Sequence, residues 1–189
     1  MRIEFHILIV LVLLATPAMA GNSAQDREQK IKAAFLYNFI NFVDWPEEKM
    51  SDNDEPVIIG IIGNKDFVNA FDPIRDKQIK GKNIIIKYFK NLNELKKCHV
   101  VLLCICGSTS PGNSREIIDA LGDSPVLTVG EQADFLENGG NINFLTVDHK
   151  IRFEINLDSA KRNNLKIRSK LLKLAKRVIN EEESTDAKR

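Results

Sequence analysis

The chain has 189 residues, of which 43% are hydrophobic and 28% are charged, and its formal net charge is +1. This composition is typical of a globular protein and excludes a long disordered chain. A near-neutral chain lacks the excess of positive charge that binding to a polyanion requires. We therefore expect no nucleic-acid partner.

The first twenty residues have the features of a cleaved secretory signal. Arg2 supplies the positive charge, Ile7–Leu14 forms an apolar run, and Ala18-Met19-Ala20 is a small-x-small cleavage site. The run is too short for a transmembrane span. An uncleaved membrane anchor is the alternative, but the good cleavage site favours export into a bacterial-type envelope with cleavage after Ala20. No cysteine follows the cleavage site, so a lipoprotein anchor is not expected.

Cleavage leaves about 169 residues, which suit one domain with a single hydrophobic core. We place this domain at residues 21–180. Residues 181–189 are polar, and we interpret them as a solvated C-terminal tail.

The segment 30–46, KIKAAFLYNFINFVDWP, predicts an amphipathic helix that Pro46 ends, because the residue before a proline avoids the α region. Its apolar half includes phenylalanines 35, 39 and 42, which we expect in the core. The other half mixes aromatic side chains with asparagines, which is unusual for an exposed polar face, so we expect it to contact either the protein's own core or a partner. That half carries Tyr37, Asn38, Asn41, Asp44 and Trp45, and Trp45 fits both interpretations.

Continuous apolar runs bounded by glycine or proline are typical of strands that are covered on both faces. We expect four such strands, at 57–62, 84–88, 100–106 and 126–129, with short helices at 66–71, 92–97, 114–121 and 132–137. Alternating polarity from Ile142 to Asn156 then predicts an antiparallel hairpin. The predicted fold class is α/β: a mostly parallel sheet flanked by helices, with an antiparallel C-terminal hairpin at one edge.

Two helices are expected after the hairpin. Asn156 or Asp158 caps a short helix that ends at Asn163-Asn164, where the backbone can turn left-handed. Ser169 caps a second helix, whose apolar stripe runs to Ile179. Eight cations crowd this region, and they suit either the wet face of an amphipathic helix or an anionic surface or acidic partner.

Three cysteines follow the signal segment. Cys98 lies roughly 20 Å along the predicted strand from Cys104, and the α-carbons of Cys104 and Cys106 are near the upper limit for a disulfide. We therefore expect no intrachain disulfide. Cys104 and Cys106 fit small core residues, while Cys98, at the strand entrance, is the one more open to redox chemistry.

The sequence carries no recognisable catalytic constellation. Only His99 and His149 follow the signal segment, no spacing indicates a metal pair, and neither a nucleophile elbow nor a phosphate loop is present. We therefore expect a protein that is not an enzyme and has no catalytic residue, metal or cofactor. Ligands of open α/β sheets bind beyond the carboxyl ends of the strands. Residues there that suit a small polar ligand, but that also form ordinary turns, are Asn64, Ser108, Thr109, Ser110 and Glu131.

Three segments together resemble the YfiR family of periplasmic proteins: KAAFLYNFINFVDWP, PVLTVGEQADFLENGGNINF and KIRFEINLDSAKRNNLKIRSKLLKLA. The resemblance covers nearly all of the chain after the signal segment. It implies an α/β homodimer in the periplasm that binds the periplasmic domain of an inner-membrane diguanylate cyclase and represses the enzyme. Stress, or an outer-membrane lipoprotein partner, relieves the repression, and cyclic di-GMP and biofilm formation then rise.

Two positions depart from the family pattern. Asn164 stands where the family usually has glycine, which is a mild change because asparagine tolerates the same backbone. The cysteines do not reproduce the disulfides that occur in the family, so redox control is not expected here.

We therefore predict a periplasmic repressor, and the alternative is a periplasmic sensor that binds a small ligand. The residues proposed to bind the partner, or to hold the binding surface in shape, are Tyr37, Asn41, Trp45, Pro46, Arg152, Glu154, Asn156 and Ser169.

Overall fold

The computed structural model describes residues 20–50, 54–104 and 113–180, without the side chains of residues 20–23. The chain begins with helix α1 (Ala20–Phe42) and strand β1 (Val43–Asp44). The central part holds β2 (Val57–Gly63), the 3-10 helix η1 (Lys65–Ile74), β3 (Gln78–Ile79), β4 (Lys82–Tyr88), the 3-10 helix η2 (Leu92–Lys97), β5 (Val100–Cys104), α2 (Ser114–Leu121) and β6 (Leu127–Gly130). The last part holds β7 (Ile142–Val147), β8 (Lys150–Asn156), α3 (Leu157–Arg162), β9 (Lys166–Ile167), α4 (Ser169–Leu172) and β10 (Arg177–Ile179).

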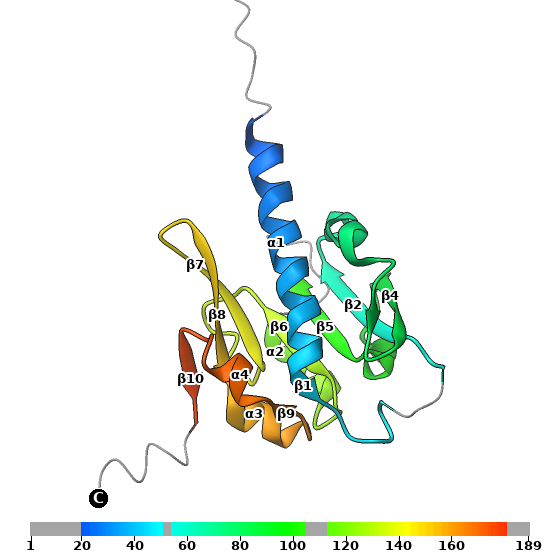
Figure 1. The fold of residues 1–189 in the computed structure, drawn as a ribbon. Coiled ribbons are helices and arrows are strands. Elements are labelled where there is room, and N and C mark those ends of the chain that lie inside the picture. Colours follow the sequence, from blue (N-terminus) through cyan, green and yellow to red (C-terminus); the bar gives the residue numbers. More distant parts are fainter. Residues whose placement is uncertain (1–19, 51–53, 105–112, 181–189) are drawn as a thin grey trace, which may run out of the picture.

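Eight of these strands form one mixed sheet in the order β10-β8-β7-β6-β5-β2-β4-β3 (Figure 1). The pairs from β4 through β2, β5 and β6 to β7 are all parallel. The β7–β8 hairpin and the short β3–β4 pair are antiparallel. The predicted α/β class is therefore confirmed, with one addition: β10 pairs in parallel with β8, outside the hairpin.

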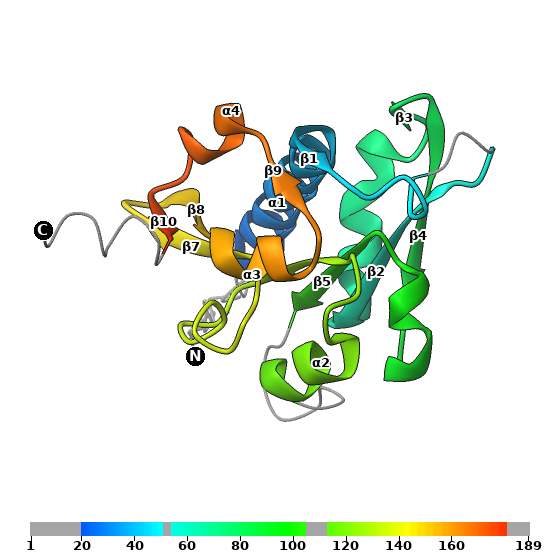
Figure 2. The same ribbon diagram turned by 90° about the horizontal axis from the view of Figure 1, so that it is seen from below.

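Alternating side chains of the central strands supply two hydrophobic cores, one on each face of the sheet. In β5, Val100 and Leu102 belong to the core beneath α1 and η1, whereas Val101 and Leu103 belong to the core beneath α2 and η2. Figure 2 shows α1 and α2 on opposite sides of the sheet. Both faces are thus covered, as the continuous apolar runs predicted.

Helix α1 crosses one face of the sheet and seals it with aromatic side chains. Phe39 is fully buried, and its ring centroid lies 4.9 Å from that of Phe153 and 5.6 Å from that of Phe144. Phe35 packs beside it, 5.8 Å from Phe153 and 6.0 Å from Phe144. The predicted core role of Phe35 and Phe39 is therefore confirmed.

The helix ends earlier than the prediction that it continues to Pro46. Val43 and Asp44 are extended instead, and they pair with Ile167 and Lys166 in a separate two-stranded sheet. Hydrogen bonding to β9 competes with the last helical turn, and Pro46 already disfavours helical backbone at the residue before it.

The predicted helix from Ser169 to Ile179 is wrong. Helix α4 stops at Leu172, and Arg177–Ile179 form the edge strand β10. Leu, Lys and Ala are good helix formers, but the open edge of β8 offers backbone hydrogen bonds that a helix could not satisfy. The predicted helix at 132–137 is also wrong, because these residues form turns, whereas Asn164 does take the expected left-handed backbone, with φ of 55°.

Candidate functional site

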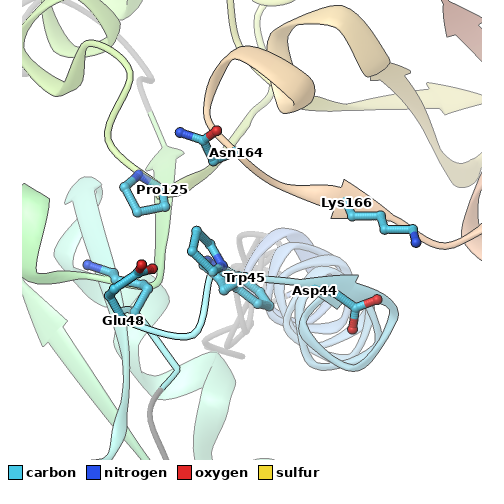
Figure 3. A pocket seen from close by; sticks show the side chains of 8 residues that line it. Asp44, Trp45, Glu48, Pro125, Asn164 and Lys166 are labelled. Atoms are coloured by element: carbon cyan, nitrogen blue, oxygen red, sulfur yellow. The ribbon is translucent and has the colours of Figure 1, made fainter.

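An open groove lies where helix α1 ends, at the amino ends of the parallel strands (Figure 3). Its volume is about 710 Å³. We call it the Trp45 groove, and its lining residues are Asp44, Trp45, Pro46, Glu48, Lys49, Pro125, Asn164 and Lys166. The groove therefore brings together the Trp-Pro motif, Pro125 in the segment before β6, and the turn that leads into β9.

The β1–β9 pair fixes one wall of the Trp45 groove. The backbone N–H of Arg168 donates to the Phe42 carbonyl at 2.9 Å. The Arg168 guanidinium donates to both carboxylate oxygens of Asp44, at 2.6 and 3.0 Å, while Lys80 lies 3.4 Å away. The hydrogen bond from Arg168 is the main cause that lowers the pKa of Asp44. Asp44 is thus held ionised at this wall.

Trp45 forms the floor of the groove and is only 8% exposed. Its ring packs edge-on against His99 with the centroids 6.4 Å apart, and the Lys80 ammonium lies 5.4 Å from the Trp45 ring centroid. The indole Nε1–H is buried and has no hydrogen-bond partner among the described residues. Trp45 is therefore both a core residue and part of a surface depression.

The turn after Trp45 forms the opposite wall, and His99 connects it to the sheet. The N–H groups of Lys49 and Met50 both donate to the Pro46 carbonyl, at 3.0 and 3.2 Å. His99 Nε2 lies 3.0 Å from the Lys49 carbonyl, and His99 Nδ1 accepts the Ile58 N–H at 3.1 Å. Burial is the main cause that lowers the pKa of His99.

A second, smaller cavity lies at the other end of the sheet, beyond the carboxyl ends of β2, β5 and β6. Its volume is about 110 Å³, and Asn64, Cys104 and Glu131 line it together with residues of α1. The structure thus brings together two of the predicted ligand-pocket residues, Asn64 and Glu131. Asn64 also caps η1, where its side chain accepts the Asp66 N–H at 2.9 Å. The other three, at 108–110, lie outside the described residues.

Lys32 of α1 closes this strand-end cavity. Its ammonium lies 2.7 Å from Glu131 and 2.6 Å from Glu28, and the residue is only 6% exposed. Burial by itself lowers the pKa of Lys32, but hydrogen bonds to Glu131 and Glu28 outweigh it, so the pKa is raised. Glu131 is therefore engaged with the protein's own helix.

The other predicted residues of α1 make internal contacts. The Tyr37 hydroxyl donates to the Gln78 carbonyl at 3.2 Å, and Lys77 lies 5.4 Å from the centre of its ring. The Asn41 amide donates to the Tyr37 carbonyl at 2.9 Å within the helix. This half of α1 thus packs on the segment that carries β3.

The four predicted residues near the C-terminus are dispersed. Arg152 and Ser169 are exposed. Glu154 accepts a hydrogen bond from Arg177 at 2.8 Å and so attaches β10 to β8. Asn156 is buried, and its side-chain amide donates to the Leu136 carbonyl. Its side-chain oxygen accepts the Ser159 N–H, so Asn156 caps the start of α3. None of these four residues lines the Trp45 groove.

Sequence reasoning missed Lys32, Lys166 and the structural role of His99. Lys32 was detectable, because it stands four residues after Glu28 on one helix, where ion pairs form. Lys166 lines the groove beside Trp45, and His99 packs against the Trp45 ring, only because the tertiary fold brings these residues together. In the described part of the chain, no group of three or more His, Cys, Asp or Glu side chains is placed to hold a metal ion.

Cys98 is buried rather than accessible at a strand entrance. It is 0% exposed, and burial is the main cause that raises the pKa of its thiol to about 11. A Cβ atom built on Gly60 would come within 2.8 Å of its sulfur, so only glycine leaves space there. The structure therefore does not favour a redox role for Cys98. Cys98 is a free thiol among the described residues, and Cys104 is buried.

Residues 29–176 match the model of DUF4154, a family described as YfiR/HmsC-like. The chain belongs to this family. The match extends from the first half of α1 to the residue before β10, so it includes the Trp45 groove and all lining residues of the strand-end cavity except Gln25 and Glu28. A comparison with curated proteins found no match.

Membership of the YfiR/HmsC-like family supports a periplasmic protein that regulates cyclic di-GMP signalling and acts through contacts with other proteins. Within the described residues, no helix is long and apolar enough to cross a membrane.

We expect Lys32→Met to lower the free energy of unfolding by about 1.5–3 kcal/mol, because the variant loses two charged hydrogen bonds but keeps the apolar stem. Urea unfolding measures this change. The matched control is Lys30→Met, since Lys30 is exposed on the same helix and should change stability by less than about 0.5 kcal/mol. Equal effects of the two substitutions would show that the strand-end ion pairs do not stabilise the fold.

We expect Cys98 to resist alkylation in the folded protein, because roughly one thiol in a thousand is ionised at pH 8 when the pKa is about 11. Iodoacetamide labelling at pH 8, with and without urea, measures this. Trypsin leaves Cys98, Cys104 and Cys106 in one peptide that ends at Arg115, so fragment spectra must locate the label. Rapid labelling of Cys98 without urea would contradict the buried position.

Proposed function

We propose that this protein binds the periplasmic domain of an inner-membrane diguanylate cyclase and keeps the enzyme inactive, which lowers cyclic di-GMP and biofilm formation. The observation that carries the proposal is the family match over residues 29–176. In this role the protein is a homodimer. It acts only by binding its partner and catalyses no reaction. An outer-membrane lipoprotein that competes for the repressor would relieve the inhibition.

The Trp45 groove is the face that we propose for the cyclase. Trp45, Pro46 and Pro125 give it an apolar centre, and Glu48, Lys49 and Lys166 give it a charged rim. An apolar centre inside a polar rim is the usual arrangement of a protein–protein interface. Trp45 and Pro46 are also the two predicted partner residues that the structure places at an open depression.

The sensor hypothesis has less support from the geometry. Pockets for small ligands commonly have volumes of about 300–1,000 Å³, whereas the strand-end cavity has only about 110 Å³. Both predicted ligand groups are already engaged within the protein, because Lys32 pairs with Glu131 and the Asn64 side chain accepts the Asp66 N–H. The repressor hypothesis is therefore the better supported of the two.

Deletion of the gene should raise cyclic di-GMP and increase biofilm, because the cyclase loses its repressor. Nucleotide extraction with mass spectrometry and a crystal-violet assay measure the two effects. Expression of the wild-type protein in the deletion strain is the control and should restore both values. If cyclic di-GMP does not rise in the deletion strain, the proposed repression is wrong.

Glu48→Trp should weaken binding to the cyclase's periplasmic domain at least tenfold, because a bulky ring in the groove obstructs docking whatever the partner's charge. Glu48 is exposed and lines the groove. Biolayer interferometry with the immobilised domain measures the affinity. The matched control is Glu116→Trp, which places the same exposed substitution on α2, across the sheet from α1 (Figure 2). If both folded variants bind like the wild type, the groove is not the contact face.

A further inference from the structure

His99 makes two hydrogen bonds that only its neutral ring can make together. Nδ1 accepts the N–H of Ile58, so this nitrogen carries no proton. Nε2 faces the Lys49 carbonyl at 3.0 Å, and therefore carries the proton that the ring donates. A second proton on the ring can bind only at Nδ1. The new Nδ1–H would then face the Ile58 N–H, and two donors cannot form a hydrogen bond with each other. Protonation must therefore break the contact between His99 and Ile58.

The charges around His99 come from three segments. Lys49 in the turn after Trp45 and Lys82 at the start of β4 both lower the pKa of His99, while Glu55 before β2 raises it. The Trp45 ring covers one side of the imidazole. Burial is the main cause that lowers the pKa of His99 below its ordinary value of 6.5, and it outweighs the hydrogen bond to the Lys49 carbonyl, which raises the pKa. At neutral pH the ring is thus uncharged.

Besides His99, two described residues of the turn attach it to the rest of the protein, and one of them, Met50, packs against the core beneath α1. The other is Lys49, whose ammonium donates to the Lys96 carbonyl at 2.6 Å, although burial lowers the pKa of this lysine. The Trp45 Nε1–H beside the turn is buried without a partner among the described residues. A buried donor without an acceptor is costly, so a movement that exposes Trp45 to water would recover part of that cost.

We propose that His99 is an acid-sensitive latch, which holds the Pro46–Met50 turn against the sheet at neutral pH and releases it when the ring is protonated. Release moves one wall of the Trp45 groove and exposes the indole. A periplasmic protein experiences the pH outside the cell, so acid would change the shape of the groove. The consequence for the cyclase rests on the proposed function, whereas the latch itself does not.

The direction of the pH effect follows from the lowered pKa. Between the folded-state pKa and 6.5, the unfolded chain binds a proton at this histidine and the native protein does not. The stability that neutral His99 contributes is therefore complete above pH 6.5 and is lost as the pH falls through the folded-state pKa. Above pH 6.5 the latch should be closed.

The protein's single tryptophan provides a direct test, because Trp45 is the only one in the chain and lies against His99. Tryptophan emission of the wild type, titrated from pH 7.5 to 5, should shift to longer wavelength with a midpoint below 6.5. His99→Gln offers one donor and one acceptor without a titrating charge, and should show no transition. His149→Gln should titrate like the wild type, because His149 is exposed in the turn between β7 and β8.

A flat wild-type titration would overturn the proposal, and so would an unchanged transition in folded His99→Gln. If His99→Gln does not fold, nitrogen-15 NMR of the wild type gives the same decision. It should show Nδ1 without a proton at pH 7.5, and a loss of the hydrogen-bonded Ile58 amide signal as Nδ1 gains a proton. Protonation of His99 with no change at Ile58 would also overturn it.

Cyclase binding separates this proposal from the proposed function. The affinity of the wild type for the cyclase's periplasmic domain should fall at least fivefold from pH 7.5 to 5.5, and that of His99→Gln should change less than twofold. A Trp45 transition without cyclase binding at any pH would reject the proposed function and keep the latch. Binding without a transition would reject the latch and keep the proposed function.

Discussion

The packing of helix α1 across the sheet determines where both candidate sites lie. Phe35 and Phe39 fix the helix on the hairpin strands through Phe144 and Phe153, with ring centroids 4.9 to 6.0 Å apart. Because the helix is anchored in its second half, its first half reaches the carboxyl ends of the parallel strands, and its end delivers Trp45 to their amino ends (Figure 1). Burial of two phenylalanine side chains contributes several kcal/mol, so the position of both sites depends on the main core and not on surface loops.

Local patterns in the sequence predicted the central sheet because each strand there is covered on both faces. Val57–Gly63 and Val100–Cys104 are continuous apolar runs whose alternate residues enter opposite cores. The C-terminal segment could not be predicted in the same way. Its apolar stripe after Ser169 suits a helix, but the backbone of β8 requires a neighbouring strand, and Val178 pairs with Ile155. That pairing depends on where the hairpin lies in the folded sheet, which a window of sequence does not reveal.

Sequence could predict those parts of the candidate sites that follow from the order and direction of the strands. Parallel strands bring their carboxyl ends together, so Asn64 and Glu131 were expected to lie close to each other, and they line one cavity. The same argument could not show that Lys32 fills the space, because Lys32 and Glu131 are 99 residues apart. Trp45 suited both a core and an interface, and the structure shows why: the side chain is buried, yet it forms the floor of an open groove.

The two ends of α1 are stabilised by different kinds of interaction, and this difference determines which end can respond to its surroundings. At the strand ends, Lys32 is held by ion pairs with Glu28 and Glu131. At the Trp45 groove, the turn is held by hydrogen bonds to a neutral histidine, and the adjacent indole N–H has no acceptor among the described residues. An unmade hydrogen bond of this kind costs about 1–3 kcal/mol, comparable to what one buried hydrogen bond at His99 can supply. The groove end therefore depends on a neutral histidine that can take up a proton, whereas the Lys32 end depends on charges that are already paired, so the proposed latch acts at the groove end alone.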